Sequence, residues 1–375
     1  MRMFSRRAIV WSSWLLVAAT VPVACAQRAA DTSFAAVVAR LSEPGGYFDS
    51  DNVVTNEASY LHIASQLTKV GVQGGAYIGV GPDQNFSYIA LIHPSVAFML
   101  DVRRDNMLEH LMYKSLFVLS RNRLEFLLRL LGKAIPQDVD AWSNRPIADI
   151  LAYVNGARVD SQSVQATRRA SNERILKFGV PLTARDQQVI DRYRATFISE
   201  GLDTRFSSLG RNNRYDYPSF GRLIMETDRN GRHLSYLADE KSYQFVRTMQ
   251  LNDKIIPVVG NVAGDKAVRA IGAYAVEHGL KVSAFYLSNV EQYLMGRDGG
   301  FDEYVKNLRT LPHDSTSVII RSYFGRGMPH PLYVPSAGNV SVSMIEPMSS
   351  FLRAYAAGEL TSYSAVVFER YVKPN

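Results

Sequence analysis

The stretch that decides the fold runs from Ala76 to Asp101 and reads AYIGVGPDQNFSYIALIHPSVAFMLD. Two short apolar runs, at 76–78 and 96–100, flank a glycine-containing turn and a helix-compatible segment at 84–92. Both runs are continuous rather than alternating, which is typical of strands buried on both faces of a parallel sheet. The stretch therefore predicts a strand–helix–strand unit of an α/β fold.

The turn and the end of the second strand carry the features of a nucleotide site. Gly79 and Gly81 let the backbone approach a ligand, and Asp101 ends the second strand 20 residues after Gly81. An acid at that place can accept hydrogen bonds from both ribose hydroxyls of an adenosine cofactor. A turn that merely needs glycine is the structural alternative. We expect Gly79, Gly81, Asn85, Asp101 and Arg103 to contact the cofactor.

The same turn disfavours a dinucleotide. The third glycine of a dinucleotide fingerprint is absent, and Asp83 in that region would repel a phosphate at the helix N-terminus. S-adenosylmethionine carries no phosphate, so this objection does not apply to it. Arg103 and Arg104 can instead grip the 2′-phosphate of NADP, which keeps an NADP-linked reductase as a minor alternative.

The rest of the chain extends this unit into a Rossmann-like, doubly wound and mostly parallel sheet. Residues 27–135 are expected to hold an N-terminal segment and the first half of the domain, and residues 254–375 the second half. Residues 136–253 are polar and are expected to form a mainly helical insertion. Within the insertion we expect helices at 161–179 and 183–200 and a long loop at 202–220.

Further elements follow from apolar runs and breaks in the chain. The helix after Asp101 is expected to be capped by Asp105 or Asn106. In the second half we expect strands at 255–259, 282–287, 317–322 and 365–368 and helices at 265–277 and 348–357. Ligands of such a sheet bind beyond the carboxyl ends of its strands.

Several longer motifs extend beyond the nucleotide unit, and they lie at 79–90, 101–106, 109–114, 286–294, 44–52 and 56–57. In these motifs the sequence resembles a family of uncharacterised bacterial proteins, often exported or lipid-anchored, with a fold like that of class I S-adenosylmethionine-dependent methyltransferases. The resemblance covers nearly the whole mature chain and implies this fold, without an established reaction. Two positions depart from the class I pattern: Tyr77 replaces an acid two residues before the first glycine, and Asp83 replaces the third glycine.

Polar residues at predicted strand ends and in the N-terminal segment supply candidate catalytic groups. Glu291 follows the predicted strand at 282–287 and can serve as a general base or hold a substrate amine. Asn289 can orient the substrate or the methionine portion of the cofactor, and Glu57 is a second candidate base. A helix cap at Asn289 and a solvated loop around Glu57 are the structural alternatives.

The N-terminus predicts export from the cytoplasm. Arginines at 6–7, an apolar run at 8–24 and a small-residue cleavage pattern ending at Ala26 indicate a signal over residues 1–26. Its basic end resembles a twin-arginine signal, and an ordinary secretory signal is the alternative. Lipidation of Cys25 is a less favoured reading. We expect a periplasmic or secreted protein without an integral membrane span once the signal is removed.

Composition excludes several classes of function. The chain has 42 basic and 35 acidic residues, a net charge of +7 that falls to about +4 without the three arginines of the signal. This mild excess and the lack of a basic run disfavour a nucleic-acid partner. The histidines never pair at i, i+4 and Cys25 is the only cysteine, so no metal site is expected. Hydrolase and phosphate-loop motifs are absent.

Two main hypotheses of function remain. The favoured one is an exported methyltransferase-like protein that moves a methyl group from S-adenosylmethionine to an unknown small acceptor. The alternative is a non-catalytic protein that binds a nucleoside or another small molecule on a degenerate fold. The substitutions at Tyr77 and Asp83 favour the alternative, as does export away from the compartment where the donor is made.

Overall fold

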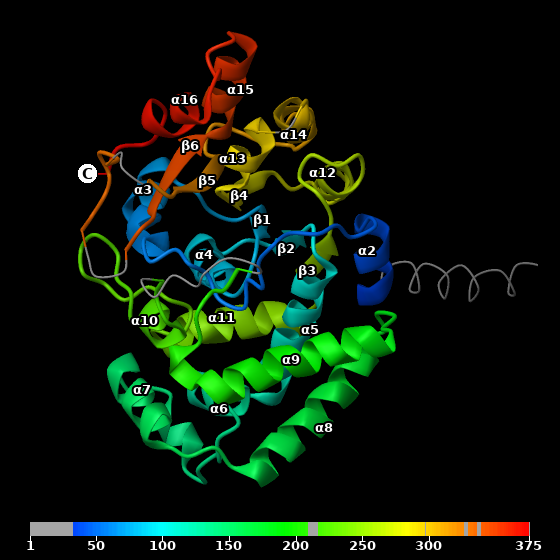
Figure 1. Ribbon diagram of the computed structural model, residues 1–375, viewed down its shortest axis with the longest axis vertical. Coiled ribbons are helices and arrows are strands. Elements are labelled where there is room, and N and C mark those ends of the chain that lie inside the picture. The colour runs from blue at the N-terminus through cyan, green and yellow to red at the C-terminus, as the bar shows by residue number, and fades with distance from the viewer. Residues whose placement is uncertain (1–32, 209–216, 297, 326–328, 336–338, 375) are drawn as a thin grey trace, which may run out of the picture.

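A six-stranded sheet in the order β3-β2-β1-β4-β5-β6 forms the centre of the molecule (Figure 1). The structure is a computed structural model that describes residues 33–208, 217–296, 298–325, 329–335 and 339–374. Strands β1 to β5 are parallel, and β6 is antiparallel to β5. The strands are β1 (Ala76–Val80), β2 (Val96–Asp101), β3 (Ile255–Val259), β4 (Val282–Ser288), β5 (Val318–Tyr323) and β6 (Val342–Pro347). The predicted α/β fold with a mostly parallel sheet is confirmed, and its strand order is compatible with a Rossmann-like arrangement.

Strand β1 lies at the point where the direction of winding reverses. The chain moves outward from β1 to β2 and β3, and then returns to β4 and β5 on the other side of β1. Gly79 of β1 therefore stands beside Met99 of β2 and Tyr286 of β4. A crevice opens at such a switch point, beyond the carboxyl ends of the strands, and is the usual place for a ligand in open α/β sheets.

Helices cover both faces of the sheet. Figure 1 shows α4, α5 and α11 below the sheet and α12, α14 and α15 above it. The helices flanking the sheet are α2 (Phe34–Leu41), α3 (Ala64–Val70), α4 (Gln84–Ile92), α5 (Arg104–Leu119), α12 (Ala267–Glu277), α13 (Val290–Met295), α14 (Gly300–Leu308), α15 (Met348–Ala356) and α16 (Tyr363–Phe368). All five parallel strands are buried along most of their length, because helices pack on both of their faces.

The polar segment between β2 and β3 is helical and packs on α5. Its predicted helices are present as α8 (Ser161–Lys177) and α9 (Ala184–Glu200), both of which contact α5. A capping box between Thr183 and Asp186 begins α9. The other helices of this part of the chain are α6 (Arg123–Leu130), α7 (Ile147–Gly156), α10 (Phe220–Ile224) and α11 (Glu240–Leu251), with short 3-10 turns at 139–142 and 201–203. Another 3-10 turn, at 60–63, precedes β1.

One predicted strand is wrong. The run at 365–368 is part of helix α16, because Ser362 caps it by accepting a hydrogen bond from the Ala365 amide. A short apolar run fits a buried helical turn as well as a strand. The last strand is instead β6, whose apolar residues are interrupted by the buried polar Ser343 and Glu346. These two side chains have partners on β5, which the sequence of β6 alone does not reveal.

The predicted cap of α5 is also wrong. The helix begins at Arg104 with Arg103 in the cap position, so Asp105 and Asn106 lie inside its first turn. The Asp101 carboxylate accepts a hydrogen bond of 2.8 Å from the backbone amide of Arg103, the residue before the helix. The start of α5 is thus set by the acid that ends β2.

The predicted export signal at 1–26, with Cys25, lies outside the described residues. Within the residues that are described, no helix is both long enough and apolar enough to span a bilayer.

Candidate ligand site

A cavity of about 640 Å³ opens at the carboxyl ends of β1, β2, β3 and β4. Each of these strands contributes lining residues from its carboxyl end or from the turn that follows it, among them Gly81, Asp101, Gly260 and Ser288. The volume lies within the range of small-molecule sites in proteins, about 300 to 1,000 Å³. The cavity therefore occupies the edge of the sheet where the sequence predicts a ligand.

Residues 43–57, here called the strap, cross this edge of the sheet and form one wall of the cavity. The Glu43 amide donates to the Val259 carbonyl at the end of β3, at 2.9 Å, and the Gly46 amide donates to the Val102 carbonyl after β2, at 2.7 Å. The strap ends at Glu57, whose carboxylate reaches the ends of β4 and β5. The strap is therefore anchored at both ends of the cavity.

The turn after β1 is braced from behind by Asn85 rather than presenting Asn85 to the cavity. The Asn85 amide donates to the carbonyls of Val80 and Pro82 at 2.9 and 2.8 Å. Its Oδ1 accepts a 2.7 Å hydrogen bond from the Tyr77 hydroxyl. Tyr77 thus stands where an acid was expected because it completes a buried brace of the turn, and Asn85, predicted to contact the cofactor, does not line the cavity.

The two glycines of the turn have different reasons to be glycine. Gly81 has φ +84°, in the left-handed region, and lines the cavity, with its carbonyl 2.9 Å from His110 Nε2. Gly79 is extended and faces the brace, where an added Cβ would lie 1.9 Å from Asn85 Oδ1 and 2.7 Å from the Tyr77 ring. Gly81 shapes the ligand face, whereas Gly79 makes room for the support behind it.

Gly79→Ala is expected to lower the free energy of unfolding by about 1 to 3 kcal/mol, the usual cost of overpacking a filled interior. The reason is that Asn85 must give up its place and its bonds to the turn. Gly156→Ala is a matched control in which no atom lies within 4 Å of the added Cβ, and it should leave stability nearly unchanged. Urea denaturation of both variants measures the difference, and equal effects would contradict the brace.

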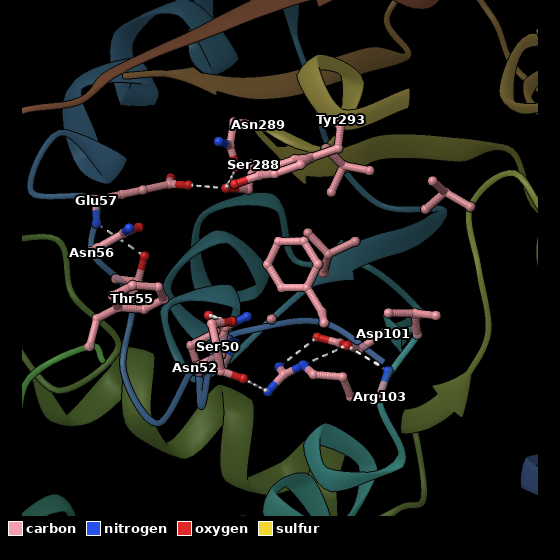
Figure 2. Close-up of a pocket in the computed structure, with 18 of the residues that line it drawn as sticks. Ser50, Asn52, Thr55, Asn56, Glu57, Asp101, Arg103, Ser288, Asn289 and Tyr293 are labelled. Carbon is pink, nitrogen blue, oxygen red and sulfur yellow. Dashed lines mark hydrogen bonds and ion pairs between the residues drawn. The ribbon is translucent and has the colours of Figure 1, made fainter. Parts of the chain in front are cut away.

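Asp101 lines the cavity but is already engaged by Arg103. Its Oδ1 accepts from the Arg103 amide at 2.8 Å and from Nε at 3.2 Å, and its Oδ2 accepts from Nη2 at 2.9 Å. A carboxylate offers about four acceptor positions, so roughly one remains on Oδ2 for a ligand hydroxyl. Figure 2 shows this pair at one end of the cavity.

The two arginines after β2 are committed to the protein itself. The Arg103 Nη1 donates to the carbonyls of Ser50 and Asp51 in the strap, at 3.0 and 2.9 Å. Arg104 binds the carboxylate of Asp186 and the carbonyl of Pro181, away from the cavity. Neither guanidinium is placed to receive a 2′-phosphate, so the geometry does not favour the NADP-linked reading.

Glu57 stands at the opposite end of the cavity and is buried, with 1% of its surface exposed. The hydroxyls of Ser288 and Ser322 each donate to one of its carboxylate oxygens at 2.5 Å, and Tyr286 adds a third hydroxyl. Burial raises the pKa of Glu57, while these three hydroxyls act in the opposite direction. In Figure 2 the Glu57 side chain points at Ser288 across the end of the cavity.

The turn after β4 presents Ser288 and Asn289 to the cavity. Ser288 has φ +53°, which is uncommon for a residue with a side chain, and the sheet register shifts at this point. Asn289 occupies the cap position of α13, but its side chain makes no capping hydrogen bond. The alternative, in which the Asn289 side chain caps α13, is therefore wrong.

Glu291 is held away from the cavity. It is fully buried, and both of its carboxylate oxygens bind Arg321 of β5, at 2.7 and 3.1 Å. Arg321 also binds Glu346 of β6 at 2.7 Å, so one cation lies between two carboxylates. Glu291 does not line the cavity and has no access to a substrate there, so the role of base that the sequence suggested for it has no geometric support.

The site also contains residues that sequence reasoning missed. Ser322 and Tyr286 complete the surroundings of Glu57, and Gln84 at the start of α4 donates to the Tyr286 hydroxyl at 3.1 Å. One signal was present, because Ser288 and Ser322 both stand at the carboxyl ends of parallel strands. Among the described residues no group of three or more His, Cys, Asp or Glu side chains is arranged to hold a metal ion.

Comparison with curated proteins gives no match. A family model matches residues 52–178 and 182–371, which include Glu57, Asp101, Ser288 and most of the cavity lining. The match covers most of the chain and both halves of the sheet. The chain therefore belongs to the family described as Domain of unknown function (DUF7790).

Proposed function

We propose that the cavity binds S-adenosylmethionine and that the protein transfers a methyl group to a small acceptor held beside Glu57. The observation that carries the proposal is that one cavity has two carboxylates of different character at its opposite ends, Asp101 and Glu57. Asp101 at the end of β2 offers an acceptor for a ribose hydroxyl, and a buried carboxylate lies beyond the turn after β4. A methyl transfer needs a held donor, a held acceptor and a base.

The lining residues fit an adenosine ligand that carries no phosphate. Val102 and Val262 supply apolar surface near Asp101 at the ends of β2 and β3, where an adenine ring would be accommodated. The backbone at Gly81 allows close approach, and Ser288 and Asn289 offer polar groups to the methionine portion. The commitment of Arg103 and Arg104 to protein partners leaves no described cation that is arranged for a pyrophosphate.

When bound, S-adenosylmethionine would supply a methyl group to a lone pair of the acceptor, and the electrons of the carbon–sulfur bond would remain on sulfur. Glu57 accepts the proton that the acceptor loses. Its raised pKa brings the carboxylate closer to the range in which general bases work at neutral pH. Ser288 and Ser322 hold the carboxylate in place, one at each oxygen.

Calorimetric titration of the purified protein with S-adenosylmethionine is expected to show binding that Asp101→Asn weakens by about tenfold, because one ribose hydrogen bond to a charged acceptor is lost. Glu57→Gln should leave donor binding within about twofold and reduce the methyl transfer rate by about 10² to 10⁴. No heat at millimolar donor would refute the proposal. Unchanged binding in Asp101→Asn, with an unchanged melting temperature, would place the donor elsewhere.

A non-catalytic nucleoside-binding protein is the second candidate. It is favoured by the engagement of Asp101 with Arg103, which takes three of about four acceptor positions on the carboxylate. In that case donor and S-adenosylhomocysteine would bind, but no acceptor would be methylated when the protein is incubated with labelled donor and extracts of small molecules.

A further inference from the structure

The Glu57 end of the cavity holds a carboxylate without a matching cation. The partners of Glu57 are hydroxyls, and none of the ion pairs among the described residues involves it. Hydroxyls that donate at 2.5 Å are typical partners of an ionised carboxylate. A buried negative charge without a positive partner is unfavourable, so a cationic ligand would gain from contact with it.

The one cation among the described lining residues is Arg103, and it stands at the other end. Its guanidinium binds Asp101 and two strap carbonyls. Arg103 therefore neutralises Asp101 and does not compensate the charge of Glu57. Asp101 and Glu57 thus differ, because the Asp101 carboxylate is paired with a cation, whereas the described partners of the Glu57 carboxylate are hydroxyls.

Aromatic residues line the cavity, and one of them contacts Glu57 directly. Tyr286 is in contact with the carboxylate itself, and Tyr323 follows Ser322 directly in β5. Tyr293 of α13 also lines the cavity (Figure 2), and its ring centroid lies 5.1 Å from that of Phe48 in the strap, in an edge-to-face arrangement. The aromatic residues of the lining are Tyr47, Phe48, Phe206, Tyr217, Tyr286, Tyr293, Tyr323 and Phe324. Faces of aromatic rings attract organic cations.

We infer that the Glu57 end of the cavity binds an organic ammonium group attached to an apolar or aromatic body, and that the methyl acceptor is therefore an amine. Naming this amine as the acceptor rests on the proposed function. The ammonium gives its proton to the Glu57 carboxylate, its nitrogen lone pair forms the new bond to the methyl carbon, and the bond from that carbon to the donor sulfur breaks with its electrons remaining on sulfur. The products are the N-methylated ammonium ion, the neutral thioether and protonated Glu57.

The test compares phenethylamine with phenethyl alcohol, which has a similar shape and no charge. Titration at about pH 8 keeps the amine protonated. The unmodified protein is expected to bind the amine at least about tenfold more tightly than the alcohol. Glu57→Gln, which preserves the shape of the side chain, should reduce this preference to about twofold or less, whereas the matched variant Asp49→Asn at the same cavity should retain it.

Titration of the amine into protein saturated with S-adenosylhomocysteine distinguishes two cases. The amine binds either at a separate acceptor site or at the position that the donor's own ammonium group would occupy. Binding of the amine to the saturated protein supports an acceptor site, and competition between the two would overturn it. Equal binding of amine and alcohol while S-adenosylhomocysteine binds would refute the ammonium site and leave the proposed function standing. Preference for the amine that depends on Glu57, without any binding of the adenosine ligands, would refute the proposed function and leave the ammonium site standing.

Discussion

Asp83→Asn is expected to make the protein more stable than the parent at about pH 8, by roughly 2 to 4 kcal/mol, and about equally stable at pH 4. Asp83 is buried, with 5% of its surface exposed, and burial raises the pKa of its carboxyl to about 7 from an ordinary value of 3.8. The Tyr236 hydroxyl donates to Asp83 Oδ2 at 3.1 Å, and an asparagine carbonyl would accept the same hydrogen bond.

The sign follows from proton binding in the two states. Because the folded chain holds the Asp83 proton more tightly than the unfolded chain, the free energy of unfolding falls as pH rises from about 4 to about 7. The asparagine variant has no proton to lose at this site, so its free energy of unfolding does not decrease for this reason as pH rises. The lower limit of the expected gain allows for the asparagine amide, which needs a partner of its own.

Urea unfolding curves at pH 4, 6 and 8 measure the effect. Asp265→Asn is the control, because the side chain of Asp265 is 98% exposed and its replacement should change stability by less than about 0.5 kcal/mol. If Asp83→Asn were no more stable than the parent at pH 8, the Asp83 carboxyl would not be titrating as a buried group.

Arg321→Met is expected to lower the free energy of unfolding by about 3 to 5 kcal/mol, the usual cost of leaving buried charges without their partner. Arg321 is fully buried and binds both Glu291 and Glu346, so its loss strands two carboxylates in the interior.

A compensated variant shows whether charge or volume is responsible. Arg321→Met combined with Glu291→Gln and Glu346→Gln should recover most of the lost stability, because a neutral interior needs no cation. Arg353→Met, at an exposed position of α15, should change stability by less than about 0.5 kcal/mol. Failure of the triple variant to recover would mean that Arg321 acts through its packing.

Local patterns in the sequence were sufficient to predict the five parallel strands and the edge of the sheet at which the cavity lies. The apolar runs before Gly79 and before Asp101 form β1 and β2, and the runs at 255–259 and 282–287 form β3 and β4. These strands are buried on both faces, so composition alone distinguishes them from their surroundings. The cavity lies where parallel strands end, as the topology requires.

The roles of individual polar side chains depended on distant partners. Glu291 and Asn289 stand two residues apart, yet α13 turns Glu291 inward to Arg321 of β5 and leaves Asn289 at the cavity. To learn that Glu57 lines the cavity and Glu291 does not therefore required knowledge of β5. Likewise, Asn85 binds Tyr77 and does not face the cavity. This orientation depends on the close packing of both side chains against Gly79, which the sequence does not show.

The strap has a consequence for the order in which the protein can assemble. Glu57 leaves the ribosome early, but its partner Ser322 lies 265 positions further along the chain, and Ser59 must wait 282 positions for Ser341. Contacts of such long range form slowly and late, because the entropy of closing the loop must be overcome first. The carboxylate end of the cavity is therefore finished only when nearly all of the chain has been synthesised, so a nascent chain exposes an incomplete pocket for most of its time on the ribosome.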